Sequence, residues 1–460
     1  MDRATFDEMR TALRGPVTGP GDEDYDRARA VYNAMIDKRP GAIVRCRDAQ
    51  DVAAAVGFAR EHDVEIAVRG GGHSGPGLGL VDGGMTIDLS PMDSVHADPD
   101  AAVVRAGGGV QLGDLDRATH AVGAATPAGI VSTTGIGGLA LGGGHGYLTR
   151  RYGLTVDSLL GADVVLADGT QVTAGPADHP DLYWALRGGG GNFGVVTSFT
   201  FRMHPVHTVG VALTLWPVER TAEVLDWYRG FMPRAPQEMY GFFAVLAVPP
   251  APPFPQEIHG KKMCGVVWCH TGDDADGGAR DLLDAAEGAG RPVFAFAAPM
   301  PYPALQGMFD ELLPPGLQWY WRGDFFDTLP DAALEVEQKY AEAIPTGLST
   351  MHLYPVDAAA HCVPRGETAW SYRDAVWSGV YAGIDPDPLN AGVIKRWCVD
   401  FWNEMHPYSM GGAYVNFVGA DEGTDRVRAT YRDHYDRLAR VKRTYDPDNV
   451  FHVNQNIEPS

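Results

Sequence analysis

The chain of 460 residues is long enough to bury large cores and to form two domains. Its 45% hydrophobic and 21% charged residues are ordinary for a soluble globular protein, and its formal net charge of −22 argues against nucleic acid or an anionic membrane as partner. No apolar run reaches the length of a membrane span, and residues 1–15 lack the apolar stretch of a signal peptide. We therefore expect a cytoplasmic protein.

The N-terminal 207 residues alternate short apolar strands with helices. Residues 1–35 are expected to hold an amphipathic helix, a Pro/Gly turn at 15–21 and the start of a second helix over 22–36. Asp51 is expected to cap the following helix, which runs through Arg60. Strands are predicted at residues 43–45, 65–68, 85–89, 102–106, 163–166, 171–173 and 194–203, and further helices at 112–121 and 181–186.

Aromatic residues and prolines become more frequent beyond residue 209. Long strands such as 209–215 alternate there with helices such as 222–232. The ring-dense segment QWYWR at 318–322 would serve core packing or the floor of a substrate pocket. The chain then closes with residues 414–417, a helix across 426–444 and a polar tail at 445–457.

The five cysteines are odd in number and scattered, which is typical of a reducing compartment and not of a disulfide framework. Cys264, Cys269 and His270 match no zinc-site spacing, and the apolar residues 266–268 between them are typical of a buried strand. We therefore expect no metal site.

Three glycine-rich stretches lie in the first half of the chain: VRGGGHSG at 68–75, GGGHG at 142–146 and GGGGNFG at 188–194. Glycines let a backbone approach a flat, polar group without obstruction by a Cβ atom. The first loop also carries His73, a nucleophilic imidazole. Together these stretches indicate a closely held cofactor that His73 could bond covalently.

A fourth stretch, GIGGLA at 135–140, matches the letters of the dinucleotide-binding fingerprint. That fingerprint needs a preceding hydrophobic strand and a following helix. Residues 128–134 make a poor strand, and the further glycines that follow would break a helix. We therefore expect no Rossmann-type site here.

Four motifs occur in one order along the chain: RGGGH at 69–73, GGLALGGGHGYLTRRYGLTVD at 137–157, RGGGGNFGVVT at 187–197 and YDPDNVFHVNQNI at 445–457. From about residue 36 to its end, the chain resembles the berberine-bridge-enzyme-like flavoproteins of the vanillyl-alcohol-oxidase superfamily. This resemblance implies an α+β fold: a PCMH-type FAD-binding domain of two α/β subdomains, and a substrate domain with an antiparallel sheet covered by helices.

The resemblance also implies how the chain is divided. Residues 1–35 would form an N-terminal helical segment and residues 36–207 the FAD-binding domain. Residues 208–410 would form the substrate-binding domain, and residues 411–460 would return to the FAD-binding domain.

The histidine of the first glycine loop is bonded to the flavin 8α-methyl carbon in that family, and His73 matches it. Many members carry a second bond from a cysteine just before the GxGG motif. Val131 stands at that position here, so the resemblance implies FAD with one 8α-histidyl bond and no cysteinyl bond. Thr134, three residues later, would lie beside the flavin, where a small side chain favours access by O2.

The remaining flavin contacts follow from the same motifs. Backbone N–H groups of residues 69–74 would bind the pyrophosphate, residues 138–146 would run beside the ribityl chain and ring, and residues 194–196 would pair with adenine or ribose. The expected cofactor-binding residues are Arg69, Gly70, Gly71, Gly72, His73, Ser74, Thr134, Gly137, Gly138, Gly142, Gly143, His145, Gly146, Gly194, Val196, Asn416, Asn454 and Asn456.

Flavin-dependent oxidation of an alcohol, phenol or amine needs a base that takes a proton as hydride leaves to N5. His352 and Tyr354 share one face of a predicted strand at 351–354, where the family commonly carries a glutamate. His352 would be a base near neutral pH without any pKa shift, or else a hydrogen-bonded sheet histidine. Tyr414 matches a family tyrosine that acts as base or orients substrate. Its pKa of about 10 would need help from a cation such as Arg373 or Arg150.

His145 is a further expected substrate contact, at a position that is usually aromatic or aliphatic in the family. The resemblance thus implies an FAD-dependent oxidase that acts on a hydroxylated small molecule, such as an alcohol, phenol, sugar or polyketide-like compound, with O2 as acceptor. A flavin monooxygenase of natural-product tailoring is the alternative, followed by a dehydrogenase or a non-catalytic flavoprotein. We expect a monomer or a homodimer.

Overall fold

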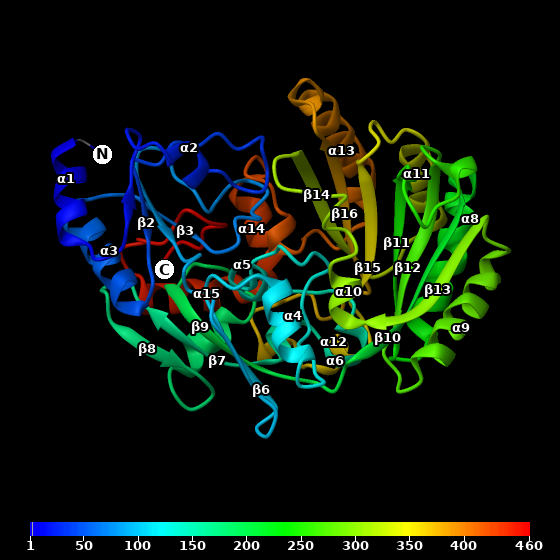
Figure 1. Cartoon of the computed structure of the whole chain (residues 1–460), viewed down its shortest axis with the longest axis horizontal. Helices are drawn as coiled ribbons and strands as arrows, with labels where there is room; N and C mark the ends of the chain where they lie inside the picture. Colours follow the sequence, from blue (N-terminus) through cyan, green and yellow to red (C-terminus); the bar gives the residue numbers. More distant parts are fainter. Residues whose placement is uncertain (2) are drawn as a thin grey trace.

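The computed structural model describes residue 1 and residues 3–460, and β-sheets of four, five and seven strands organise it (Figure 1). The four-stranded sheet has the order β1 (Val17–Thr18), β2 (Ala42–Arg45), β4 (Met85–Asp88), β3 (Ile66–Arg69), and β2, β4 and β3 are parallel. The antiparallel five-stranded sheet has the order β5 (Val95–Asp98), β6 (Val103–Gly107), β9 (Val195–Arg202), β7 (Leu159–Val165), β8 (Gln171–Ala174). The strands predicted in this half of the chain are all present.

The seven-stranded sheet is antiparallel throughout and lies to the right in Figure 1. Its order is β13 (Phe294–Pro301), β10 (Thr208–Pro217), β12 (Lys262–His270), β11 (Met239–Ala247), β15 (Thr350–Pro355), β16 (Trp377–Asp385), β14 (Gln318–Phe326). Four helices pack on its outer face, away from the two smaller sheets: α8 (Thr221–Phe231), α9 (Ala275–Ala286), α11 (Asp331–Glu342) and α13 (Ala391–Met405). This arrangement confirms the expected α+β fold with a helix-covered antiparallel sheet.

The remaining helices cover the smaller sheets and the boundary with the large one. They are α1 (Arg3–Ala12), α2 (Tyr25–Ala28), α3 (Ala49–Glu61), α4 (Leu112–His120), α5 (Ile136–Gly142), α6 (Thr149–Tyr152), α7 (Pro180–Leu186), α10 (Tyr302–Gln306), α12 (Ala359–Cys362), α14 (Gly423–Tyr431) and α15 (Tyr435–Tyr445).

Two predictions about the N-terminal region are wrong. The second helix predicted at 22–36 is limited to α2, and the chain is then irregular, because Asn33 forms an isolated bridge with Leu317 next to β14. The Asn33 side chain donates to the carbonyl oxygens of Gly75, at 2.8 Å, and Trp319, at 2.9 Å. Asp48, and not Asp51, caps α3, since its carboxylate accepts from the Asp51 N–H at 2.8 Å.

The GIGGLA stretch also differs from expectation, because it does form a helix, α5. Ile136, Ala140 and Leu141 are buried in the core between α5 and the five-stranded sheet. Their burial stabilises helix α5 in spite of its glycines. The helix ends at Gly142, where Gly143 has a φ of +126°. Residues 128–134 before it are not a strand, so no Rossmann-type unit forms.

The C-terminal segment returns to the five-stranded sheet. The helix predicted across 426–444 is broken into α14 and α15, because Arg432 has a φ of +47°. Leu438 and Val441 of α15 share a core with β7 and β9. The polar tail then folds around Lys442, whose ammonium donates to Asp446 at 2.7 Å and to the Phe451 carbonyl at 2.9 Å.

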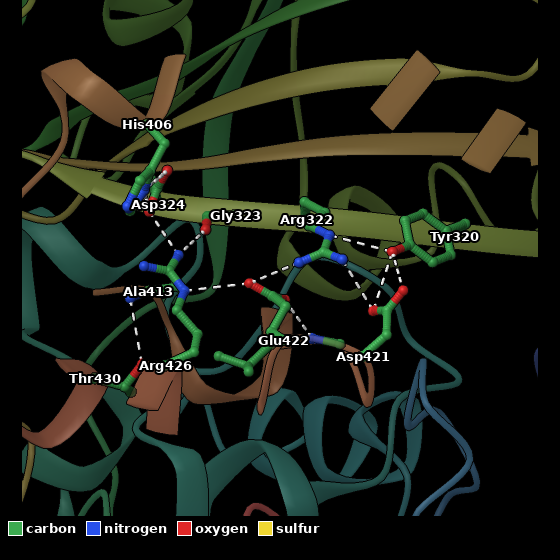
Figure 2. Close-up of polar contacts among 12 residues, drawn as sticks. Tyr320, Arg322, Gly323, Asp324, His406, Ala413, Asp421, Glu422, Arg426 and Thr430 are labelled. Carbon is green, nitrogen blue, oxygen red and sulfur yellow. Dashed lines mark hydrogen bonds and ion pairs between the residues drawn. The ribbon is translucent and has the colours of Figure 1, made fainter. Parts of the chain in front are cut away.

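A buried charged cluster joins the start of this segment to β14 (Figure 2). Arg426 of α14 contacts Asp324 of β14 at 2.5 Å and Glu422 at 3.2 Å, and Arg322 contacts the same Glu422 at 3.1 Å. Figure 2 shows Glu422 between the two guanidinium groups. Because every charge has an opposite partner, the cluster can fix residues 411–422 against the large sheet.

Candidate functional site

A cavity of about 1160 Å³ lies between the inner face of the seven-stranded sheet and the glycine-rich loops of the N-terminal half. Alternate residues of the sheet point into it, as expected for strands with one face toward a cavity. Examples are Leu213 on β10, Phe242 and Ala244 on β11, and His352 and Tyr354 on β15. The C-terminal segment contributes residues 414–418, 451 and 453–455, in part through Asn416 and Asn454.

His73 lies on the loop after β3 and lines this cavity. Its Nε2 is 3.1 Å from the hydroxyl oxygen of Thr133, and its ring stacks on Tyr32 with 3.9 Å between centroids. Burial lowers the pKa of His73 to about 4, so the imidazole is neutral at physiological pH. A neutral ring held on both sides is a nucleophile with a fixed orientation.

The expected phosphate loop lines the cavity through Arg69, Gly70, Gly71, Gly72 and Ser74. The Arg69 guanidinium is not free for a phosphate, because it contacts Asp88 at 2.9 Å and the Ala28 carbonyl at 2.6 Å. The Ser74 hydroxyl accepts from the Leu78 N–H at 3.1 Å. Backbone N–H groups and the Ser74 O–H are therefore the donors that this loop can offer.

The glycines of the cavity wall leave room that a side chain would fill. Beyond its immediate chain neighbours, a Cβ atom at Gly138 or Gly191 would have no atom of the described residues within 4 Å. A Cβ atom at Gly71 would lie 2.3 Å from the Gly135 nitrogen, so these two loops pack backbone against backbone. Several buried polar atoms facing the cavity also lack a partner within the described residues, namely both ring nitrogens of His145, Nε1 of Trp319 and Trp321, and Oδ1 of Asn454. Such a wall fits a large, flat and polar ligand.

His352 and Tyr354 meet in the cavity, as their spacing predicts. The Tyr354 hydroxyl lies 2.5 Å from Nδ1 of His352. The expectation of an unshifted base is wrong, because desolvation lowers the pKa of His352 to about 3. Burial likewise raises the pKa of Tyr354. Both side chains are therefore neutral, and one hydrogen-bond proton lies between the Tyr354 oxygen and Nδ1 of His352.

Tyr414 also lines the cavity, but its hydroxyl is saturated. It accepts from Gly144 N–H at 3.2 Å and from the Asn416 amide at 2.7 Å, and it donates to the Leu139 carbonyl at 3.2 Å. Burial raises its pKa.

The predicted cationic helper for Tyr414 is wrong. Arg373 contacts Asp157 at 2.6 Å and Arg150 contacts Asp357 at 2.8 Å, so each guanidinium already has a buried carboxylate partner. Tyr414 therefore connects the glycine loop to Asn416, and its geometry does not make it a base.

The structure brings the other expected residues to the cavity with four exceptions. Thr134, Gly137, Gly138, His145, Gly194, Val196, Asn416 and Asn454 line it, and so does Val131, at the position where the family often has a cysteine. Gly142, Gly143, Gly146 and Asn456 do not. A Cβ atom at Gly142 would meet the Asn416 side chain at 2.6 Å, and one at Gly143 would meet Trp370 at 2.1 Å. These glycines serve packing behind the wall.

Sequence reasoning missed Tyr32 and Thr133, which hold His73 from both sides. Tyr32 carries no local signal, because it falls in a segment predicted to be helical. Trp319 and Trp321 of the ring-dense segment line the cavity, so this segment forms part of the pocket. Trp319, which is 8% exposed, also packs in a hydrophobic core cluster, so the segment serves the core as well.

Two kinds of feature are absent among the described residues, 1 and 3–460. No cluster of three or more His, Cys, Asp or Glu side chains is arranged to hold a metal ion. No helix there has the length and apolar character needed to cross a membrane.

Comparison with known proteins identifies this architecture. Residues 40–175 match the model of the FAD binding domain, and residues 413–458 match the berberine and berberine-like model. The FAD-linked oxidoreductase YgaK of Bacillus subtilis (strain 168), itself uncharacterized, is 31% identical over 98% of both chains. (R)-6-hydroxynicotine oxidase of Paenarthrobacter nicotinovorans is 30% identical over 97% of both chains.

Solved structures agree with these relatives. The crystal structure of 6-hydroxy-D-nicotine oxidase from Arthrobacter nicotinovorans superposes with a TM-score of 0.85, at 26% identity, over 97% of this chain and 98% of that one. BBE-like 1 of Physcomitrella patens shares the fold, with a TM-score of 0.86 over 99% of both chains at 24% identity. The chain therefore belongs to the berberine-bridge-enzyme-like family of FAD-linked oxidoreductases.

Proposed function

We propose that this enzyme carries FAD bonded to His73 alone and oxidises a hydroxylated small molecule, with O2 as the electron acceptor. The observation that carries the proposal is the continuity of one cavity, which extends from the His73 loop to the His352–Tyr354 pair. A cofactor bonded at His73 would thus share a single cavity with a substrate held at the large sheet. The apolar residues of that sheet would keep water from the reacting atoms.

The residues around His73 support a single covalent bond. Because Nε2 of His73 faces the Thr133 hydroxyl, Nδ1 is the ring nitrogen left for the flavin. Val131 offers no thiol for a second bond. The N–H groups of residues 70–74 would bind the phosphates, and the open surface at Gly138 and Gly191 would receive the flat ring or the ribityl chain. Bound FAD supplies an acceptor for the substrate hydride at N5 and returns the electrons to O2.

The His352–Tyr354 pair would accept the substrate proton. As the substrate C–H bond gives up its hydride, the hydroxyl O–H bond breaks and its proton passes to this pair. Since both groups are neutral and 2.5 Å apart, a proton taken at one can be shared with the other. The low pKa of His352 makes it a weak base, so proton transfer has to accompany hydride loss and not precede it.

We also propose that residues 36–207 and 411–460 form the flavin-binding half, which the common core of α15 with β7 and β9 supports. A cytoplasmic location is supported by the five free cysteines, of which Cys362 is exposed.

Acid precipitation of the purified enzyme tests the covalent bond. Flavin that stays with the pellet, on the peptide holding His73 and on no other, supports the single bond. Flavin in the supernatant overturns it. Release of peroxide with an alcohol or phenol then separates an oxidase from a dehydrogenase, while incorporation of an oxygen atom into product would indicate a monooxygenase.

A further inference from the structure

The part of the cavity under the seven-stranded sheet is uncharged. Among the described residues that line the whole cavity, only Arg69 and Glu311 carry a formal charge. The Arg69 charge is neutralised by Asp88 at 2.9 Å, and Glu311 is exposed on the loop before β14. An ionised ligand at the sheet would lose its water and meet no opposite charge there.

The polar groups under the sheet are few and neutral. Burial lowers the pKa values of His352 and His145 to about 3 and raises the pKa of Tyr354. The surrounding wall is apolar and comes from neighbouring strands and one loop: Val211, Leu213, Phe242, Val267 and Phe309. A carbohydrate would bring many hydroxyl groups to this wall and leave most of them unpaired, which is unfavourable.

His145 is the polar group that most needs a partner. It is 7% exposed, and neither ring nitrogen has a hydrogen-bond partner among the described residues. Its ring is held between those of Tyr354 and Tyr414, with 5.0 and 4.9 Å between centroids. A neutral imidazole presents one donor and one acceptor, and a substrate hydroxyl or carbonyl can use either. Satisfied buried polar groups are the rule in proteins, so a ligand is expected to complete this one.

We infer that the enzyme takes an uncharged, largely apolar alcohol or phenol in preference to carbohydrates and ionised compounds, and that His145 recognises its polar group. The reaction on this ligand rests on the proposed oxidase function, whereas its selective binding does not. Specificity would then come from the absence of charge as much as from the contact to His145.

Calorimetric titration of the flavin-loaded enzyme under anaerobic conditions tests the substrate class. The probes are 2-naphthalenemethanol, its ionised counterpart 2-naphthoate, and cellobiose. The alcohol is expected to bind at least about tenfold more tightly than either of the others. Equal or tighter binding of naphthoate or cellobiose would overturn the inference, and so would failure of the alcohol to bind at about 1 mM.

Substitutions at His145 test the recognition. His145→Phe keeps an aromatic ring without nitrogens and is expected to weaken binding of the alcohol about tenfold. His145→Gln keeps a donor and an acceptor and should retain most of the affinity. His96→Phe, at an exposed position of β5, is the matched control and should bind as the wild type does. Unchanged affinity in His145→Phe would overturn the role of His145.

Flavin absorbance in the same samples separates this inference from the proposed function. If the alcohol binds selectively but never bleaches the flavin under anaerobic conditions, the oxidase proposal fails and the binding class stands. If cellobiose bleaches it faster than the alcohol does, the binding class fails and the oxidase proposal stands.

Discussion

The Tyr354 hydroxyl lies 2.5 Å from Nδ1 of His352, on adjacent inward positions of β15. Burial keeps both side chains neutral, so they can share a proton but are poor separate bases.

Removal of the hydroxyl in Tyr354→Phe should therefore lower kcat about 10- to 100-fold, because the proton then has only His352 to accept it. Flavin content should not change. Steady-state peroxide release with an identified substrate measures kcat. Tyr240→Phe is the control, since the hydroxyl of that buried tyrosine on β11 has no partner among the described residues and does not line the cavity. Equal kcat values for the two variants would exclude the pair from catalysis.

Gly138→Ala should reduce flavin incorporation without loss of fold stability. Its Cβ atom would meet no protein atom within 4 Å and would project into the cavity. In helix α3, Gly57 has the same open surroundings but lies outside the cavity, so Gly57→Ala is a matched control. Both substitutions should leave the free energy of unfolding unchanged or raise it by about 1 kcal/mol. The ratio of flavin to protein absorbance should fall only in Gly138→Ala, and an equal ratio in the two would contradict this placement of the ring.

Thr134→Leu should slow reoxidation of the reduced flavin by O2 more than it slows reduction by substrate. Thr134 lines the cavity beside the glycine wall, where a larger side chain would obstruct a small molecule. Stopped-flow absorbance gives the two rates separately. Val131→Leu, at a neighbouring lining position, serves as the control for added volume. Loss of both rates to the same extent would point to a general distortion of the site.

Acid should destabilise the protein in part through His145. Its pKa is lowered from 6.5 to about 3, so only the unfolded state binds a proton in that interval. The free energy of unfolding is therefore unaffected by His145 above pH 6.5 and decreases progressively as the pH falls toward 3. At pH 5 the loss is about 2 kcal/mol.

His145→Phe should accordingly lose about 2 kcal/mol less than the wild type between pH 7 and pH 5 in urea titrations. The exposed His96→Phe variant should follow the wild-type curve. Parallel curves for all three proteins would show that His145 is not buried as a neutral group.

Arg426→Met should destabilise the protein by about 3–5 kcal/mol, because it leaves Asp324, fully buried in β14, without its guanidinium partner. Arg428→Met on the same helix removes an exposed guanidinium and should cost less than about 1 kcal/mol. Addition of Asp324→Asn to Arg426→Met should recover part of the loss. Similar unfolding midpoints for the two single variants would contradict the role of the cluster in Figure 2.

Local pattern was enough to predict most strands and the glycine loops. The alternation of His352 and Tyr354 on one face, for example, depends only on the two-residue period of a strand. The helix predicted at 22–36 stops after α2, because Asn33 gains hydrogen bonds to Gly75 and Trp319 only in the folded chain. Tertiary contacts outweigh helix propensity at such a position.

By itself, the sequence determined the family, the histidine of the first glycine loop and the absence of a cysteine at Val131, because colinear motifs carry these features. The tertiary structure alone decided the protonation of the site. The sequence offers Arg150 and Arg373 as cationic helpers of Tyr414, and only the folded chain pairs them with Asp357 and Asp157. The pKa of His352 depends on desolvation by strands far away in the chain, and a pKa shift of this kind has no local sequence signal.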